Sequence, residues 1–306
     1  MNENKNRLET DFCGIKFKNP IIPASGTFGY GREYEEFYPL STLGGISVKG
    51  TTGKRRNGNL PPRIAETPSG MLNSVGLQNP GIDSFIEKEL PYLKTKNTVI
   101  IANIAGSTAE EYEEIAGKLD NTDVDMLEVN ISCPNVKAGG AAFGVSCEGA
   151  GTITKIVRRA TKKPVMMKLS PNVTDIASIA KACEAEGADA VSLINTLLGM
   201  RIDINTRRPI LHNNVGGLSG PAVFPVAVRM VWQTANAVNI PVCGMGGVSS
   251  WEDAVEMMMA GASLIQVGAA LFTDPMTPLK IIDGLEDYCR RQNTDLKNIV
   301  GTVMPW

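Results

Sequence analysis

Short, almost wholly apolar segments recur along the chain and alternate with longer amphipathic segments. Eight of the short segments are rich in β-branched residues, and they span residues 21–25, 45–49, 99–103, 126–131, 165–168, 190–195, 241–244 and 264–268. Strands buried on both faces have such near-continuous apolar sequences, and alternation with helices is typical of parallel strands. The pattern therefore predicts an α/β protein with eight parallel strands.

The amphipathic segments carry signals for the start and end of a helix. Three predicted helices have such signals: 107–119, opened by a capping box over Ser107 to Glu110; 174–186, capped by Thr174; and 250–260, capped by Ser250. Gly187 and Gly261 end the last two helices. They lie in the similar sequences EGADAV at 186–191 and AGASLI at 260–265. The two glycines are 74 residues apart (261 − 187), which fits two strand–helix units of about 37 residues each. This spacing favours a single (β/α)8 TIM barrel domain over residues 1–306 and disfavours a doubly wound sheet.

Three further segments are predicted to flank the barrel. Residues 8–18 alternate like a small hairpin around Gly14, and we expect this hairpin to close the bottom of the barrel. Residues 50–80 are rich in Gly, Pro, Asn and Arg, which predicts a functional loop over the barrel mouth. Residues 134–151 contain five glycines, which predicts a mobile lid.

Composition and charge narrow the class of protein. The 306 residues include 30 Lys and Arg against 32 Asp and Glu, so the net charge of −2 gives no basic surface for nucleic acid. The polar N-terminus and the absence of a long apolar stretch predict neither a signal peptide nor a membrane span. Six scattered cysteines without a CxxC pair indicate a reduced, cytoplasmic protein. The single histidine, His212, excludes most histidine-rich metal sites, so no metal is expected.

Polar residues and glycines end the predicted strands, where the active sites of such barrels lie. They are Ser25, Lys49, Asn103, Asn130 with Cys133, Lys168, Asn195 with Thr196, Gly246 with Gly247, and Gly268. Glycines after the seventh and eighth strands expose backbone amides that bind phosphate, and residues 216–220 are expected to add a third set. The phosphate belongs to a sugar phosphate or to flavin mononucleotide (FMN). Lys168 favours FMN, because a fixed positive charge stabilises a reduced flavin ring.

Cys133 is the leading candidate for a catalytic residue. It follows a strand end and lies among Asn130, Ser132 and Asn135. In a chain with one histidine, a cysteine thiolate is the predicted general base, and Lys49 is expected to favour the thiolate. The other five cysteines are expected to be small buried hydrophobic residues, and His212 is expected to be structural.

Five motifs in order resemble class 1 dihydroorotate dehydrogenase. They are NSVGLQNPG at 73–81, NISCPNVK at 130–137, KLSPN at 168–172, INTLLGM at 194–200 and GGLSGP at 216–221. The resemblance extends from about residue 8 to residue 275. The sequence NVKAGG at 135–140 resembles the NAD-linked class 1B catalytic subunit rather than the fumarate-linked class 1A homodimer. Gly50 and Ala269 depart from the family, which usually has Ala and Thr at these positions.

The resemblance implies a role for each matching residue in the oxidation of dihydroorotate to orotate during pyrimidine biosynthesis. Cys133 would remove the C5 proton while the C6 hydride passes to N5 of FMN. The residues implied to bind the substrate are Lys49, Asn73, Ser74, Val75, Gly76, Leu77, Asn130, Asn195 and Thr196. Those implied to bind FMN are Ser25, Lys49, Gly50, Asn103, Asn130, Lys168, Ile194, Gly220, Gly246, Gly247, Gly268 and Ala269.

Reoxidation of the flavin is expected to need a second protein. The chain has no GxGxxG after a strand and no cysteine cluster for an iron–sulfur centre. The class 1B resemblance implies a partner subunit that carries FAD and a [2Fe-2S] cluster and passes electrons to NAD. It also implies a heterotetramer built around a homodimer of this chain.

Three rival functions remain open at the level of sequence. A flavin enzyme similar to dihydropyrimidine dehydrogenase would oxidise dihydrouracil rather than dihydroorotate. A sugar-phosphate lyase or isomerase on the same barrel would purify as a colourless protein. A flavin-binding scaffold inside a larger redox complex would lose no activity in that complex on Cys133→Ser.

Overall fold

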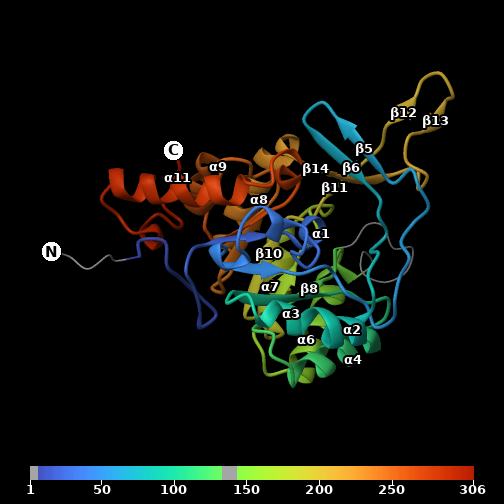
Figure 1. The fold of residues 1–306 in the computed structure, drawn as a ribbon, viewed down its shortest axis with the longest axis horizontal. Coiled ribbons are helices and arrows are strands. Elements are labelled where there is room, and N and C mark those ends of the chain that lie inside the picture. The colour runs from blue at the N-terminus through green and yellow to red at the C-terminus, as the bar shows by residue number, and fades with distance from the viewer. Residues whose placement is uncertain (1–5, 133–142) are drawn as a thin grey trace.

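The computed structural model describes residues 6–132 and 143–306. Parallel strands form the centre of the molecule (Figure 1). There are eight of them, in the order β3-β16-β15-β10-β9-β8-β7-β4. Their bounds are β3 (Ile21–Pro23), β4 (Gly45–Ser47), β7 (Val99–Ile104), β8 (Met126–Asn130), β9 (Val165–Lys168), β10 (Ala190–Leu193), β15 (Val242–Met245) and β16 (Ala262–Val267). Each overlaps one of the eight apolar segments, so the predicted TIM barrel is confirmed.

The two end strands of this order, β3 and β4, lie side by side and nearly close the barrel. The amide of Gly44 donates a hydrogen bond to the carbonyl oxygen of Ile21 at 3.0 Å. A Cβ atom at Gly44 would lie 2.0 Å from the carbonyl oxygen of Asn19, so only glycine allows the backbones to approach this closely.

Helices cover the outside of the barrel (Figure 1). The longer ones are α4 (Ala109–Asp120), α6 (Cys147–Ala160), α7 (Ile176–Ala185), α8 (Phe224–Ala235), α9 (Trp251–Met259) and α11 (Thr277–Arg291). The short ones are α1 (Ser25–Phe28), α2 (Ile82–Ser84), α3 (Leu90–Lys94), α10 (Ala270–Thr273), the 3-10 helices η1 (Tyr34–Glu36), η2 (Leu40–Thr42), η4 (Pro221–Val223) and η5 (Leu296–Asn298), and the π-helix η3 (Phe85–Glu89). The first five residues of α6 include Gly149 and Gly151, so the predicted lid over 134–151 is wrong for residues 147–151; residues 134–142 lie outside the described part.

Two of the three predicted helix caps differ from the structure by one residue. Helix α4 is capped by Thr108, whose Oγ1 accepts from the amide of Glu111, while Glu111 Oε2 accepts from the Ser107 amide at 2.7 Å. Asp175 rather than Thr174 caps α7, because a carboxylate also complements the positive end of the helix dipole. Ser250 caps α9 as predicted, in a capping box with Asp253.

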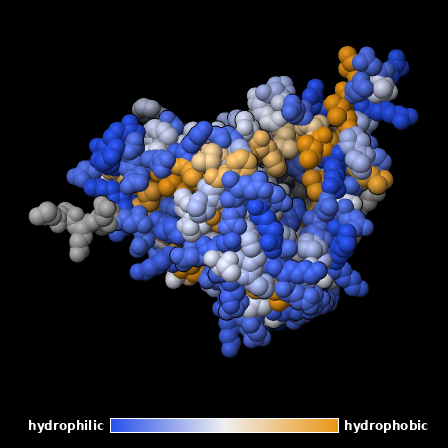
Figure 2. Space-filling model, in the orientation of Figure 1, coloured by the Kyte–Doolittle hydropathy of each residue, from blue (hydrophilic) through white to orange (hydrophobic). Residues whose placement is uncertain are grey.

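An accessory antiparallel sheet lies beside the barrel mouth. Its order is β11 (Leu197–Gly199), β14 (Gly216–Ser219), β6 (Gly70–Asn73) and β5 (Ile64–Thr67), and a two-stranded arm of β12 (Ile202–Asp203) and β13 (Arg208–Pro209) extends from it (Figure 1). The expectation of a loop over 50–80 is therefore wrong for 64–73, which form a hairpin that pairs with a distant segment. Figure 2 shows apolar residues gathered over this sheet and arm. The exposed Ile64, Leu198 and Ile202 belong to β5, β11 and β12.

The N-terminal hairpin plugs the bottom of the barrel, as predicted. Strands β1 (Thr10–Phe12) and β2 (Ile15–Phe17) pair antiparallel, and the rings of Phe12 and Phe17 meet edge to face with their centroids 6.3 Å apart. Both rings are fully buried against the lower barrel interior, which consists of Ile22, Ile101, Met126, Met166, Ala190, Cys243 and Leu264.

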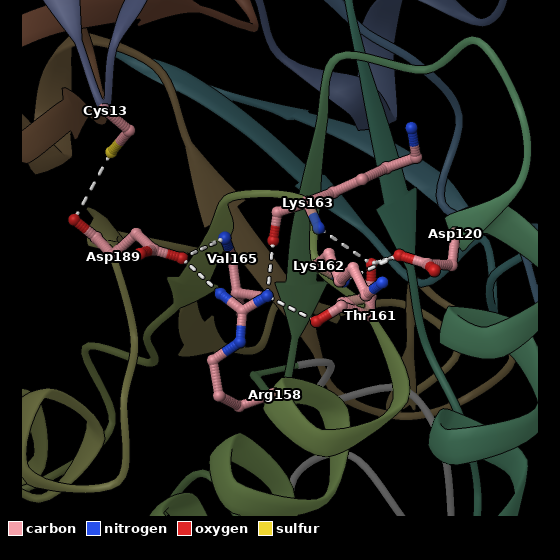
Figure 3. Close-up of polar contacts among 8 residues, drawn as sticks. All are labelled: Cys13, Asp120, Arg158, Thr161, Lys162, Lys163, Val165 and Asp189. Carbon is pink, nitrogen blue, oxygen red and sulfur yellow. Dashed lines mark hydrogen bonds and ion pairs between the residues drawn. The ribbon is translucent and has the colours of Figure 1, made fainter.

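A polar network ties the hairpin turn to the lower barrel (Figure 3). The Cys13 thiol donates to the carbonyl oxygen of Asp189 at 3.3 Å. The Asp189 carboxylate accepts from Arg158 at 2.6 Å and from the Val165 amide at 2.8 Å, while Arg158 also donates to the carbonyl of Lys163 at 2.8 Å. Burial, with the nearby charge of Asp189, raises the pKa of Cys13 to about 12, so the thiol stays protonated.

In the described part of the chain, no helix is long and apolar enough to cross a membrane.

Phe17→Ala is expected to lower the free energy of unfolding by about 3–5 kcal/mol, because it leaves a cavity at the bottom of the barrel. Urea unfolding measures this loss. Lys16→Ala, on the exposed position next to it, serves as the control and is expected to change stability by less than about 0.5 kcal/mol. Equal stability of the two variants would contradict the role of the hairpin as a plug.

Candidate functional site

A cavity opens at the carboxyl ends of the barrel strands, between the barrel and the accessory sheet. It encloses about 1210 Å³ of space, including its opening to solvent. The predicted site residues that line it are Ser25, Lys49, Gly50, Asn73, Val75, Gly76, Leu77, Asn103, Asn130, Lys168, Ile194, Asn195, Thr196, Gly220, Gly246, Gly247, Gly268 and Ala269. Residues distributed over most of the sequence therefore converge on one site.

Two predicted site residues are not among those that line the cavity. Ser74 is fully buried; its amide donates to the Arg63 carbonyl at 2.8 Å, and its own carbonyl accepts from Asn59 at 2.9 Å. It thus holds the loop behind the cavity wall. Cys133 lies outside the described residues.

The predicted third set of amides over 216–220 is wrong for Gly216 and Gly217, which pair within the accessory sheet. A Cβ atom at Gly217 would lie 1.9 Å from Oγ1 of Thr196, so this glycine allows β14 to pack against a cavity-lining residue. Residues 218–220 do line the cavity.

The ends of β8 and β10 are joined by asparagine side chains. Asn130 Oδ1 accepts from the hydroxyl of Ser132 at 2.8 Å, and Asn195 Nδ2 donates to the same hydroxyl oxygen at 2.8 Å. Asn195 Oδ1 accepts from the Thr196 amide at 2.8 Å. Because Asn130 Oδ1 already accepts a hydrogen bond, Asn130 Nδ2 is the side-chain group available to a ligand.

Glycines with positive φ angles shape one side of the cavity. Gly246 and Gly247 have φ angles of 122° and 78°. A Cβ atom at Gly247 would lie 2.8 Å from the carbonyl oxygen of Gly220, and one at Gly246 would lie 2.9 Å from the side chain of Ile194. Bare backbone is therefore required here, as in the phosphate sites found after the last strands of such barrels.

Glu128 in β8 is a site residue that the sequence analysis missed. It is fully buried, and four side chains donate to its carboxylate: Ser47 at 2.7 Å and Asn103 at 2.6 Å to Oε2, and Ser192 at 2.8 Å and Gln266 at 2.6 Å to Oε1. An acidic residue inside the apolar run 126–131 was the signal that could have revealed it, because a buried carboxylate needs such partners.

The Glu128 carboxylate is held in its ionised form. Burial acts to raise its pKa, but the charge of Lys168 and the hydrogen bonds from Ser47, Asn103 and Ser192 outweigh burial, so the pKa is lowered from its usual value. Lys168 is itself only 5% exposed and lines the cavity. A negative and a positive charge are thus buried together at the cavity floor.

Asn103 and Gln266 both line the cavity and both leave a buried acceptor unused. Within the described part of the chain, Asn103 Oδ1 and Gln266 Oε1 have no hydrogen-bond partner. Buried acceptors of this kind are normally satisfied, so the two oxygens fit a ligand that supplies N–H or O–H donors. No group of three potential metal ligands occurs among the described residues.

The fold and the cavity define a parallel α/β barrel whose mouth suits a phosphate-bearing ligand with a polar ring. The chain belongs to the dihydroorotate dehydrogenase family, because the family model described as dihydroorotate dehydrogenase matches residues 7–289. It is 57% identical over 298 residues to a protein of Parabacteroides distasonis, covering 97% of this chain and 98% of that relative.

Two further relatives have similar identities. The protein of Alkaliphilus metalliredigens is 54% identical over 300 residues, covering 98% of this chain and 99% of the relative. That of Thermoanaerobacter sp. strain X514 is 53% identical over 297 residues, covering 97% and 98%. All three relatives are named dihydroorotate dehydrogenase B (NAD+), catalytic subunit.

Lys168→Met is expected to lower the free energy of unfolding at pH 7 by about 3–5 kcal/mol, because Glu128 loses its buried counter-charge. The lowered pKa of Glu128 contributes stability above the pH at which the unfolded carboxyl ionises, and this contribution is lost as the pH falls. The difference between parent and variant should therefore shrink as the pH falls from 7 toward about 4.

Urea unfolding of both proteins across this pH range measures the effect. The control is Lys181→Met on the exposed face of α7, which should stay within about 0.5 kcal/mol of the parent at every pH. A Lys168→Met loss that is constant with pH would show that Lys168 does not stabilise the Glu128 carboxylate.

Proposed function

We propose that this protein oxidises dihydroorotate to orotate as the catalytic subunit of an NAD-linked dihydroorotate dehydrogenase. The similarity to relatives of that name over nearly the whole chain is the observation that carries the proposal. The cavity supports it, because it brings together two lysines, four asparagines and a glycine turn at the barrel mouth. Residues 1–306 form one domain in this proposal.

FMN is the proposed cofactor, and the cavity fits it in three ways. The unpartnered oxygens of Asn103 and Gln266 suit the hydrogen-bond donors of a flavin. The buried ammonium of Lys168 suits the electron-rich edge of the ring, and the backbone at Gly246 and Gly247 suits the phosphate. FMN, when bound, supplies the acceptor for the hydride from C6 of the substrate.

The FMN-binding set proposed from the sequence is Ser25, Lys49, Gly50, Asn103, Asn130, Lys168, Ile194, Gly220, Gly246, Gly247, Gly268 and Ala269. The structure adds Gln266 as a further candidate, because its Oε1 lacks a partner and the residue lines the cavity. Ala269 lacks the hydroxyl usual at this position of the family, so at this residue only the backbone is offered to the phosphate. The side chain of Asn103 needs room beside Gly50, where a Cβ atom would lie 2.8 Å from Oδ1.

The substrate is proposed to bind on the same side of the cavity as the accessory sheet. The ammonium of Lys49 complements the carboxylate of dihydroorotate, and the amides of Asn130 and Asn195 complement its ring amides. The proposed substrate set is Lys49, Asn73, Ser74, Val75, Gly76, Leu77, Asn130, Asn195 and Thr196, with Ser74 supporting the loop. Cys133 is proposed to hold the proton taken from C5 on its Sγ atom.

A partner subunit is proposed to take the electrons onward to NAD. The relatives are named catalytic subunits, which supports a second subunit. We propose that this partner carries FAD and a [2Fe-2S] cluster, that the complex is a heterotetramer around a homodimer of this chain, and that it works in the cytoplasm.

Anaerobic mixing of the purified yellow protein with dihydroorotate tests the reaction. We expect rapid bleaching of the flavin absorbance, and no bleaching with dihydrouracil, which lacks the carboxylate that Lys49 would bind. Bleaching by dihydrouracil alone, or by neither compound, would refute the proposed substrate.

Cys133→Ser is expected to keep its yellow colour but to slow flavin reduction by about 10²–10⁴-fold near neutral pH, because a hydroxyl is a far weaker base than a thiolate. Stopped-flow absorbance measures the rate. Cys147 was expected to be buried but is the exposed first residue of α6. Cys147→Ser is therefore the control, and its flavin should be reduced at the parent rate. An unchanged rate in Cys133→Ser would remove Cys133 from the mechanism.

Gly247→Ala is expected to weaken FMN binding by about tenfold or more, because a methyl group 2.8 Å from the Gly220 carbonyl must displace the backbone around the phosphate. Flavin fluorescence on titration gives the dissociation constant. Gly14→Ala is a matched control: its φ of 76° imposes the same backbone strain, but it lies in open space in the hairpin turn. Equal effects of the two substitutions would mean that strain alone is responsible.

A further inference from the structure

One layer of the barrel interior is polar. Six of the eight barrel strands contribute a side chain to it: Ser47 from β4, Asn103 from β7, Glu128 from β8, Lys168 from β9, Ser192 from β10 and Gln266 from β16. Branched apolar residues normally fill this position in such barrels. The layer lies between the apolar plug at the bottom and the cavity at the mouth, and three of its members line the cavity.

The carboxylate of Glu128 dictates the orientation of two amide side chains in this layer. An ionised carboxylate only accepts hydrogen bonds, so Asn103 must turn its Nδ2 and Gln266 its Nε2 toward it, both at 2.6 Å. Their carbonyl oxygens must then point away from Glu128, and both are buried acceptors that lack a partner in the described part of the chain.

We propose that Glu128 is a positioning residue, which fixes Asn103 and Gln266 so that the cavity floor presents two hydrogen-bond acceptors beside the ammonium of Lys168. The ligand recognised by this arrangement is a ring or polyol with N–H or O–H donors next to an electron-rich edge. The inference rests on the proposed function, in which that ligand is FMN.

Stability alone does not explain a carboxylate at this position. A buried ion pair is often replaced by apolar residues of similar volume with no loss, or with a gain, of stability. The four buried donors around Glu128 need an acceptor, and for two of them, Asn103 and Gln266, the direction of the side chain also decides which atom faces the cavity. The serines differ from the amides in this respect, because Ser47 and Ser192 are fully buried and are not among the residues that line the cavity.

Glu128→Gln separates the two roles, because it keeps the shape of the side chain and introduces one NH2 group. In the place of Oε2 the NH2 group faces Ser47 and Asn103. In the place of Oε1 it faces Ser192 and Gln266. The serine hydroxyl can rotate to accept, but Asn103 or Gln266 must flip, which turns one acceptor at the cavity floor into a donor. We expect FMN to bind about 10–100-fold more weakly, as for a lost buried hydrogen bond, and its visible absorption band to move.

A carboxylate–amide exchange provides a rescue. In Asn103→Asp/Glu128→Gln, the new NH2 group at position 128 donates to one oxygen of the carboxylate at position 103. The other oxygen is again an acceptor at the cavity floor, and the charge of the layer is conserved. We expect FMN affinity to return to within about tenfold of the parent.

The experiment measures FMN dissociation constants and flavin absorption spectra for the full-length parent, Glu128→Gln, the exchange variant and Ser192→Ala. Ser192→Ala removes one hydrogen bond from the same carboxylate without turning an amide, so its affinity should stay within about threefold of the parent. Parent-like affinity in Glu128→Gln, no recovery in the exchange variant, or an equal loss in Ser192→Ala would each overturn the inference. If Glu128→Gln does not fold, the exchange variant decides, since it must fold and bind FMN.

The outcomes also separate this inference from the proposed reaction. FMN affinities that follow the expected order, together with a flavin that dihydroorotate fails to reduce, would retain Glu128 as a positioning residue and reject the reaction. A parent protein that binds no FMN would overturn both.

Discussion

Burial of one ionised carboxylate in the barrel is the constraint on which the site depends. Glu128 stays charged only because strands β4, β7, β10 and β16 each bring a hydrogen-bond donor to it and β9 brings Lys168. A shift of any one of these strands by one residue would turn its side chain out of the barrel. The register of the barrel and the chemistry of the cavity floor are therefore specified by the same contacts.

The barrel interior divides into an apolar lower part and a polar upper part. The hairpin β1–β2 fills the lower part with two phenylalanine rings, which supplies hydrophobic stabilisation far from the mouth. The upper part can then carry polar groups and unpartnered acceptors. The free-energy cost of leaving these acceptors without hydrogen bonds is removed only when a ligand binds. This division keeps the demands of stability and of binding on different residues.

The barrel strands were predictable because strands that are buried on both faces have near-continuous apolar sequences. The observed helix caps Thr108 and Asp175 each lie one residue after the predicted cap, because neighbouring Ser, Thr and Asp residues compete for the same position. The accessory sheet escaped prediction, since pairing between 70–73 and 216–219 has no local signal. Most predicted site residues do meet at one cavity, but Glu128 was missed because its donors come from four other strands. The role of Cys133 stays a prediction.

The accessory sheet links completion of the binding cavity to the order of folding. Strands β6 and β14 pair Asn73 with Gly217, 144 positions apart (217 − 73), and β3 and β16 pair Ile21 with Ile265, 244 positions apart (265 − 21), whereas each single strand–helix unit of the barrel closes over a few tens of residues. Long-range closure carries a larger entropic cost and follows local structure. A ligand that binds only the finished mouth stabilises it by mass action. If FMN is that ligand, as proposed, its binding therefore favours chains in which the accessory sheet is fully paired over chains in which it is open.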